Sequence, residues 1–147
     1  MPVCLPFPLV YRRDNRIPRL NITPPYPRQP WLEKPLVAIN PEIIESKGEY
    51  VMEEGCLSVP GVRDEVTRAE SIRVRFTDGN FERVEMELSG MWARVFQHEY
   101  DHLQQKFFIN RLSGVKRQLL KPKLSRIKRG DVQTRYPVVS SVDEGKR

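Results

Sequence analysis

The stretch from residue 91 to residue 103 constrains the fold more than any other part of this 147-residue chain. Drawn as a helix, it carries apolar side chains nearly all round, which is typical of a helix buried on every side. The string HEYDH at residues 98 to 102 lies inside this helix. Ionisable groups are costly to bury unless they find partners or a metal ion. The sequence therefore predicts a buried helix whose polar groups are held by specific contacts.

The two histidines of this string have the spacing of metal ligands. His98 and His102 are the only histidines in the chain. Positions i and i+4 lie on one side of a helix, so the two imidazoles can bind one metal ion. Glu99 points toward the same region and can take a proton from water at that ion. A chance match of five residues, with both histidines satisfied within an ordinary core, is the alternative.

A catalytic metal site of this kind needs a third protein ligand and an open position for water. Zincin peptidases take the third ligand from a downstream Glu or His, but here no histidine follows His102 and the next acid after it is Asp131. Upstream, Cys56 follows Gly55 and precedes a turn-prone Ser-Val-Pro segment, where a thiolate is well placed to bind a metal. A small buried apolar residue is the alternative for this cysteine.

The segment before the buried helix has the pattern of a β-hairpin. Apolar and polar residues alternate from 72 to 77 and again from 83 to 88, with Asp78-Gly79-Asn80 between the two runs. A period of two predicts strands with one apolar and one solvated face. Ser89 can cap the following helix, and Gly90 permits the turn into it.

Prolines set the organisation of the N-terminal part. Nine of the 13 prolines fall in the first 35 residues, which predicts an extended or meandering arm over residues 1–34. A short buried strand is expected at residues 36 to 39, bounded by Pro35 and by Asn40-Pro41. The predicted fold class is α+β, with antiparallel strands packed around a central metal-binding HExxH helix.

Basic residues are concentrated at the C-terminal end. Of the net charge of +6, residues 1–113 contribute −1 and residues 114–147 contribute +7. The cations alternate with apolar residues at roughly helical spacing, so residues 113–147 are predicted to form a basic helix or tail. Pro122 is expected to kink or split this helix. A basic RNA-binding module is one interpretation, although residues 114–135 contain no aromatic side chain on which bases could stack.

No apolar stretch of the chain is long enough to span a membrane. The apolar run from Val3 to Val10 is interrupted by Pro6 and Pro8 and is not preceded by basic residues, unlike a secretion signal. We therefore expect a protein of the cytoplasm or, in a eukaryote, of the interior of an organelle. A monomer is the expected oligomeric state.

The string EGCLSVPG, which begins at Glu54, is followed about 40 residues later by QHEYDHL. Together they resemble the second and third signature motifs of the peptide deformylase family, over roughly residues 35–112, the predicted catalytic core. This resemblance implies a metal-dependent hydrolase that removes the N-formyl group from the N-terminal methionine of nascent polypeptides and releases formate. It also implies that Cys56, His98 and His102 are the metal ligands.

The resemblance assigns further roles. Glu99 is implied as the general acid and base, and the backbone N–H of Leu57 as a donor to the developing oxyanion. Gly55 would lie beside the substrate backbone. Met91 and Val95 are candidates for the pocket that accepts the methionine side chain, with a plain core role as the alternative.

Metal and partners also follow from the resemblance. Ferrous iron is the expected metal, with zinc, nickel or cobalt also accepted, and a thiolate ligand suits a softer or redox-active ion. The expected partners are formyl-methionyl nascent peptides and, through the basic helix, the ribosome. Arg63 and Arg68 match basic positions that recur in the family, where a solvated or ion-paired role is expected.

The family's first motif, which is GxGxAAxQ-like and supplies a glutamine donor to the oxyanion, is missing from the sequence. Residues 1–34 contain no glycine, and Gln29 lies in a proline-rich setting that does not fit the motif. Three explanations are open: a truncated chain, a divergent deformylase with another donor, or an inactive relative that keeps the metal site. An HExxH metallopeptidase is a further alternative, but it would need a downstream ligand.

Overall fold

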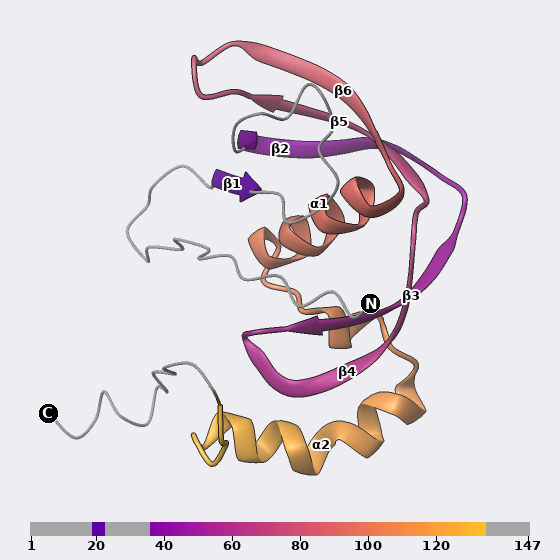
Figure 1. Cartoon of the computed structure of the whole chain (residues 1–147), viewed down its shortest axis with the longest axis vertical. Helices are drawn as coiled ribbons and strands as arrows, with labels where there is room; N and C mark the ends of the chain where they lie inside the picture. Colours follow the sequence, from indigo (N-terminus) through magenta and orange to yellow (C-terminus); the bar gives the residue numbers. More distant parts are fainter. Residues whose placement is uncertain (1–18, 23–35, 135–147) are drawn as a thin grey trace, which may run out of the picture. The chain divides into compact units, whose positions relative to one another are not determined.

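The computed structural model describes residues 19–22 and 36–134 and has the predicted α+β class (Figure 1). Two α-helices, a short 3-10 helix and six strands form in this part of the chain. In chain order they are β1 Arg19–Ile22, β2 Leu36–Lys47, β3 Tyr50–Cys56, β4 Val59–Arg68, β5 Ser71–Thr77, β6 Arg83–Ser89, α1 Gly90–Leu103, η1 Phe108–Arg111 and α2 Gly114–Lys128.

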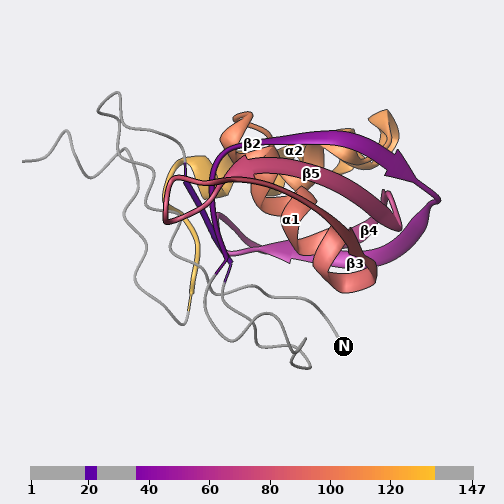
Figure 2. The same ribbon diagram turned by 90° about the horizontal axis from the view of Figure 1, so that it is seen from above.

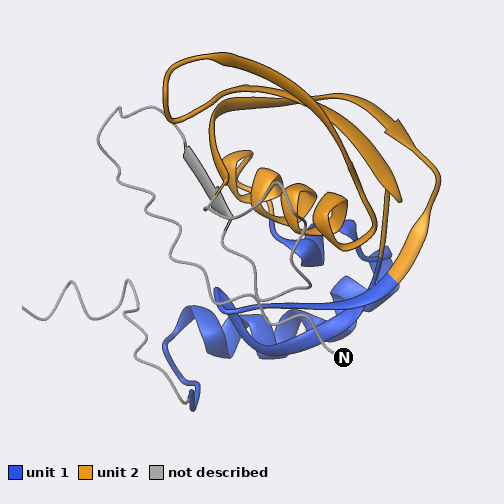
Figure 3. Cartoon of the chain, turned by 45° about the horizontal axis from the view of Figure 1, so that its top comes forward, with its two compact units in different colours: residues 1–5, 52–66, 107–147 blue, residues 6–51, 67–106 orange. Residues whose placement is uncertain are grey.

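The described residues form two compact units (Figure 3). Unit 1 comprises residues 52–66 and 107–134, and unit 2 comprises residues 19–22, 36–51 and 67–106. The predicted N-terminal arm lies outside the described residues except for β1, and so does the end of the predicted C-terminal tail. No described helix has the length and apolar character needed to span a lipid bilayer.

Unit 2 contains a four-stranded sheet with the order β1-β2-β5-β6. Each neighbouring pair is antiparallel, as predicted. Helix α1 runs across one face of this sheet, as the two views in Figures 1 and 2 show. It contacts both strands of the β5–β6 hairpin that precedes it in the chain. The buried helix and the sheet therefore share one core.

The predicted hairpin is confirmed in its register and in its faces. Val74 pairs with Met86, and Arg73 pairs with Glu87 on the opposite face. The turn is closed by Asp78, whose carboxylate accepts hydrogen bonds from two backbone N–H groups further along the turn. The hairpin's most buried apolar side chains are Ile72, Val74, Phe76 and Leu88.

Strand β2 is longer than predicted. It does not end at Asn40-Pro41 but continues to Lys47. Its register with β5 shifts between Ile39 and Glu42, which marks a β-bulge or irregularity, and Asn40 has a φ of +49°. A bulge takes a residue out of the hydrogen-bonded ladder, so a proline that lacks an N–H can be accommodated there. The expected strand end is therefore a bulge within a continuous strand.

The left-handed backbone of Asn40 gives a stability prediction. The change Asn40→Val should lower the free energy of unfolding by about 1–2 kcal/mol, because a residue with a Cβ branch fits this region poorly. Asn40→Gly should have little effect. Urea unfolding of both variants measures the difference, with Ser46→Val on the same strand as the control. Equal stability of the valine and glycine variants would contradict the assigned backbone.

The start of α1 differs in one detail from the prediction. Ser89 occupies the N-cap position, but its side chain makes no capping hydrogen bond. Gly90 has a φ of +55°, and its N–H donates to the carbonyl of Glu70 at 2.8 Å. The turn into the helix is therefore held by the backbone of the glycine rather than by the serine hydroxyl.

Unit 1 contains most of the two-stranded sheet of β3 and β4, together with α2. Its core is formed by Val59, Val62, Val66, Phe108 and Leu112, against which Leu120, Leu124 and Ile127 of α2 pack. Of the kink or split expected at Pro122, the split is wrong, because α2 runs from Gly114 to Lys128. Ser113 caps its start by accepting from Lys116 N–H, and apolar packing holds the turns around the proline.

Candidate metal centre

Helix α1 brings the two histidines together, as the sequence predicts. The ring centroids of His98 and His102 are 4.9 Å apart, and the rings are nearly perpendicular. His98 is buried, and His102 is half-buried. The pair follows directly from the i, i+4 spacing on a continuous helix.

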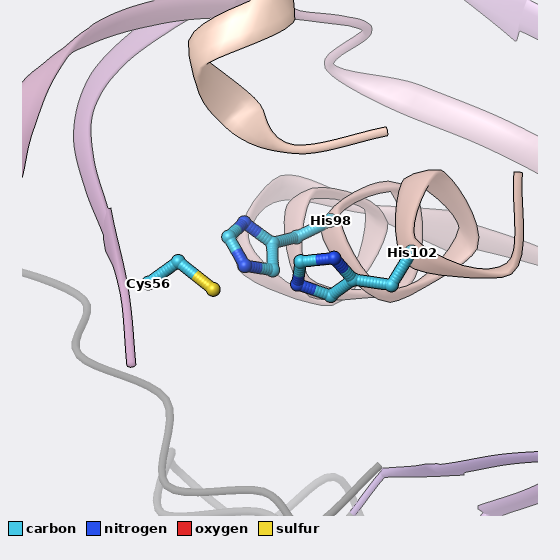
Figure 4. A group of neighbouring side chains, drawn as sticks. All are labelled: Cys56, His98 and His102. Carbon is cyan, nitrogen blue, oxygen red and sulfur yellow. The ribbon is translucent and has the colours of Figure 1, made fainter. Parts of the chain in front are cut away.

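Cys56 is the last residue of β3 and is half-buried. Its Sγ and one nitrogen of each histidine all lie within 4.8 Å of one another, and the three side chains face one another in Figure 4. Ligands of one tetrahedral ion lie roughly 3.5 Å apart, because metal–ligand bonds are about 2.0–2.3 Å long. A thiol and two imidazoles are also ligands that zinc and iron accept. The donor set therefore fits a divalent transition metal.

The other predicted catalytic groups lie next to these three side chains in the chain. Glu99 follows His98 on α1 and is buried, with 4% of its surface exposed. Leu57 follows Cys56 in the turn between β3 and β4. A carboxyl beside one ligand and a backbone N–H beside another are the groups that proton transfer and oxyanion stabilisation require.

For Gly55, Met91 and Val95, close packing alone can explain which residue stands at each position. A Cβ on Gly55 would come within 3.2 Å of Cγ of Arg63 and 3.4 Å of the carbonyl of Val62. Close packing against β4 therefore favours glycine at this position. Val95 is 1% exposed and Met91 is half-buried. Their pocket role remains a prediction, since a plain core role explains the same burial.

Ion pairing of the two arginines is confirmed. Arg63 lies 3.7 Å from Glu53, and both side chains are partly exposed. Arg68 forms a buried pair with Asp101, with 2.8 Å between Nη1 and Oδ2. Sequence reasoning did not identify this partner, nor did it give a role to Gln97. The only feature of the sequence that points to Gln97 and Asp101 is that both lie in the motif around the histidines.

The comparisons with known proteins decide the family. The family model described as polypeptide deformylase matches residues 16–118. The chain belongs to the peptide deformylase family. The peptide deformylase of Salinibacter ruber is 46% identical over 117 residues, which cover 79% of this chain and 60% of the relative. That of Chlorobium phaeovibrioides is also 46% identical, with 71% and 55% covered.

Solved deformylase structures have the same fold. The crystal structure of a Legionella pneumophila peptide deformylase superposes with a TM-score of 0.59 at 42% identity, covering 72% of this chain and 62% of that one. Arabidopsis thaliana deformylase 1B, solved with an inhibitor, gives 0.63 at 31% identity, with 75% and 64% covered. The chain thus spans 55–60% of the length of the two curated relatives from Salinibacter ruber and Chlorobium phaeovibrioides.

Metal content tests the cluster. The chain should bind one divalent ion, and Cys56→Ser or His98→Ala should each weaken binding at least 10-fold because a direct ligand is lost. Mass spectrometric metal analysis after gel filtration measures the stoichiometry. Cys4→Ser, which removes the other thiol of the chain, is the matched control. Full metal content in the Cys56→Ser variant would exclude the thiol as a ligand.

Proposed function

We propose that this chain carries the catalytic core of a peptide deformylase, which hydrolyses the N-formyl group of N-terminal methionine and releases formate. The observation that supports it most is the grouping of Cys56, His98 and His102 within 4.8 Å in a chain of this family. The core is assigned to residues 35–112. Formylated nascent peptides as the substrate place the protein in the cytoplasm or an organelle interior.

The proposed mechanism assigns the proton transfers to Glu99. A divalent ion held by the cysteine and the two histidines would supply Lewis-acid activation of water and of the formyl carbonyl. Glu99 accepts a proton as the water oxygen adds to the formyl carbon. The same carboxyl then returns the proton to the amine as the C–N bond breaks, leaving formate and a free N-terminus.

The remaining groups hold the substrate. The backbone N–H of Leu57 donates to the oxygen that gains negative charge, and Gly55 allows the substrate backbone to approach. Met91 and Val95 are proposed to contact the methionine side chain. Fe²⁺ is the proposed native ion, because a thiolate ligand favours a softer metal, and Zn²⁺, Ni²⁺ or Co²⁺ are the alternatives.

An inactive relative that keeps the metal site is the alternative function. The sequence has no match to the family's first motif, whose glutamine would be a second oxyanion donor. Loss of one such donor typically costs about 2.7–4 kcal/mol of transition-state stabilisation. The chain is therefore expected to turn over slowly. The family match lends no support to an HExxH metallopeptidase.

Formate release from a formyl-Met peptide tests the function. The anaerobically purified chain, loaded with Fe²⁺ or Ni²⁺, should release formate, and Glu99→Gln should lower the rate about 10²–10⁴-fold by removing the base. Glu87→Gln, an exposed glutamate on β6, is the matched control. No release from a chain with one bound ion would identify an inactive relative. Equal rates in the two variants would remove Glu99 from the mechanism.

Contact with the ribosome through α2 is a further part of the proposal. The apolar side chains Leu120, Leu124 and Ile127 pack on the core of unit 1. Arg117, Lys121 and Lys128 are exposed. Cations on an exposed helix face attract the phosphates of ribosomal RNA. Deletion of the helix would expose the core of unit 1, so charge neutralisation is the cleaner test.

The triple variant Arg117→Gln, Lys121→Gln and Lys128→Gln should bind ribosomes more weakly. Each lost phosphate contact should reduce the slope of log affinity against log salt by roughly 0.7–0.9. Co-sedimentation at several salt concentrations measures this slope. A control with the same loss of charge neutralises Lys47, Arg83 and Lys106, which are exposed elsewhere. Equal slopes in the two variants would exclude α2 as the contact.

A further inference from the structure

Residues 68–70, at the end of β4 and in the turn that leads to β5, contact α1 near both ends of the helix. Near the C-terminal end, Arg68 donates from Nη1 to Oδ2 of Asp101 at 2.8 Å. At the N-terminal end, the carbonyl of Glu70 accepts from the N–H of Gly90 at 2.8 Å. These residues all belong to unit 2.

Ala69, which lies between Arg68 and Glu70, binds the middle of the helix. The Ala69 N–H donates to Oε1 of Gln97 at 3.1 Å, and Nε2 of Gln97 donates to the Ala69 carbonyl at 2.9 Å. The same Nε2 lies 2.9 Å from the Ala93 carbonyl on the preceding turn of the helix. The amide of Gln97 thus pairs with both groups of one backbone residue, which fixes its orientation as well as its position.

The contacts at Arg68 and Gln97 are shielded from water. The side chains of Arg68 and Asp101 are 0% and 5% exposed, and Gln97 is 5% exposed. Removal of one member of a buried ion pair leaves an uncompensated charge, which is strongly destabilising. The helix therefore cannot turn about its axis without breaking these contacts.

The two residues of α1 that make these contacts are next to the proposed metal ligands in the chain. Gln97 directly precedes His98, and Asp101 directly precedes His102. Residues four apart share a helix face, and the next residue along lies about 100° further round. A rotation of α1 about its axis changes the direction of all its side chains by the same angle. Contacts that fix Gln97 and Asp101 therefore also fix the direction in which the two imidazoles point.

We propose that Arg68, Gln97 and Asp101 are positioning residues that set the rotation of α1 and hence the alignment of His98 and His102 for metal binding. This inference rests on the proposed metal-dependent function. An imidazole nitrogen lies roughly 6 Å from the helix axis, so a rotation of 10° moves it by about 1 Å. Metal–ligand distances tolerate only about 0.2 Å. Supporting contacts of this kind typically account for 10–100-fold in metal affinity.

Two variants remove the contacts without leaving a lone buried charge. Gln97→Met keeps the volume but loses both hydrogen bonds to Ala69. The double variant Arg68→Met with Asp101→Leu replaces the buried pair by apolar groups, which is often neutral for stability. The matched control is Arg75→Gln with Glu85→Gln, which removes an exposed ion pair of 2.6 Å in the same unit.

Two readouts separate positioning from stability. Competition with a chromophoric chelator gives the dissociation constant for Ni²⁺, and urea unfolding gives the stability of the metal-free chain. The proposal predicts Ni²⁺ binding weakened 10–100-fold in both variants under conditions where the metal-free proteins remain folded, with unchanged binding in the control. The absorption spectrum of the Co²⁺-loaded variants should also change, because ligand alignment alters the d–d bands.

Folded variants that bind Ni²⁺ with the affinity of the unmodified chain would overturn the inference and leave the proposed function intact. Failure of the unmodified chain to bind any metal would instead overturn the proposed function. If the double variant does not fold, Arg68→Lys keeps the charge and loses the planar guanidinium. The Ni²⁺ affinity and the urea unfolding of Arg68→Lys and Gln97→Met then test the positioning role.

Discussion

Burial of polar groups on α1 is the constraint on which the rest of unit 2 depends. Glu99 and Asp101 lie in the interior beside apolar residues, as does Arg94. Each polar group in such a helix must be satisfied by another element, since an unpaired buried charge would outweigh the gain from packing. Arg94 donates to the carbonyl of Tyr50 and lies 5.4 Å from the centroid of its ring. The strand ends and turns around α1 thus supply partners as well as apolar surface.

Much of this fold could be predicted because its elements have clear periods. The alternation in β5 and β6 and the helical spacing of His98 and His102 depend only on local sequence, and both are confirmed. The passage of β2 through Asn40-Pro41 could not be predicted in this way. A bulge depends on the neighbouring strand, whose register the local sequence does not contain.

The partners of buried charges were also beyond prediction from spacing. Arg68 and Asp101 are 33 residues apart, and nothing in the local pattern around either residue names the other. The sequence did indicate that acids on a buried helix need partners, and the ion-paired role expected for Arg68 is confirmed. The local sequence made Cys56 a candidate for the third ligand, and the order and spacing of two family motifs then linked it to the histidines with which the structure groups it.

We propose that one thiolate and two imidazoles bind a single ion. X-ray absorption spectroscopy of the Zn²⁺-loaded chain tests it most directly, because sulfur and nitrogen ligands differ in bond length and in scattering. We expect one sulfur at about 2.3 Å and two imidazole nitrogens at about 2.0–2.1 Å, with the sulfur absent in Cys56→Ser. A bound ion surrounded only by oxygen and nitrogen, or a sulfur shell that persists in Cys56→Ser, would contradict it.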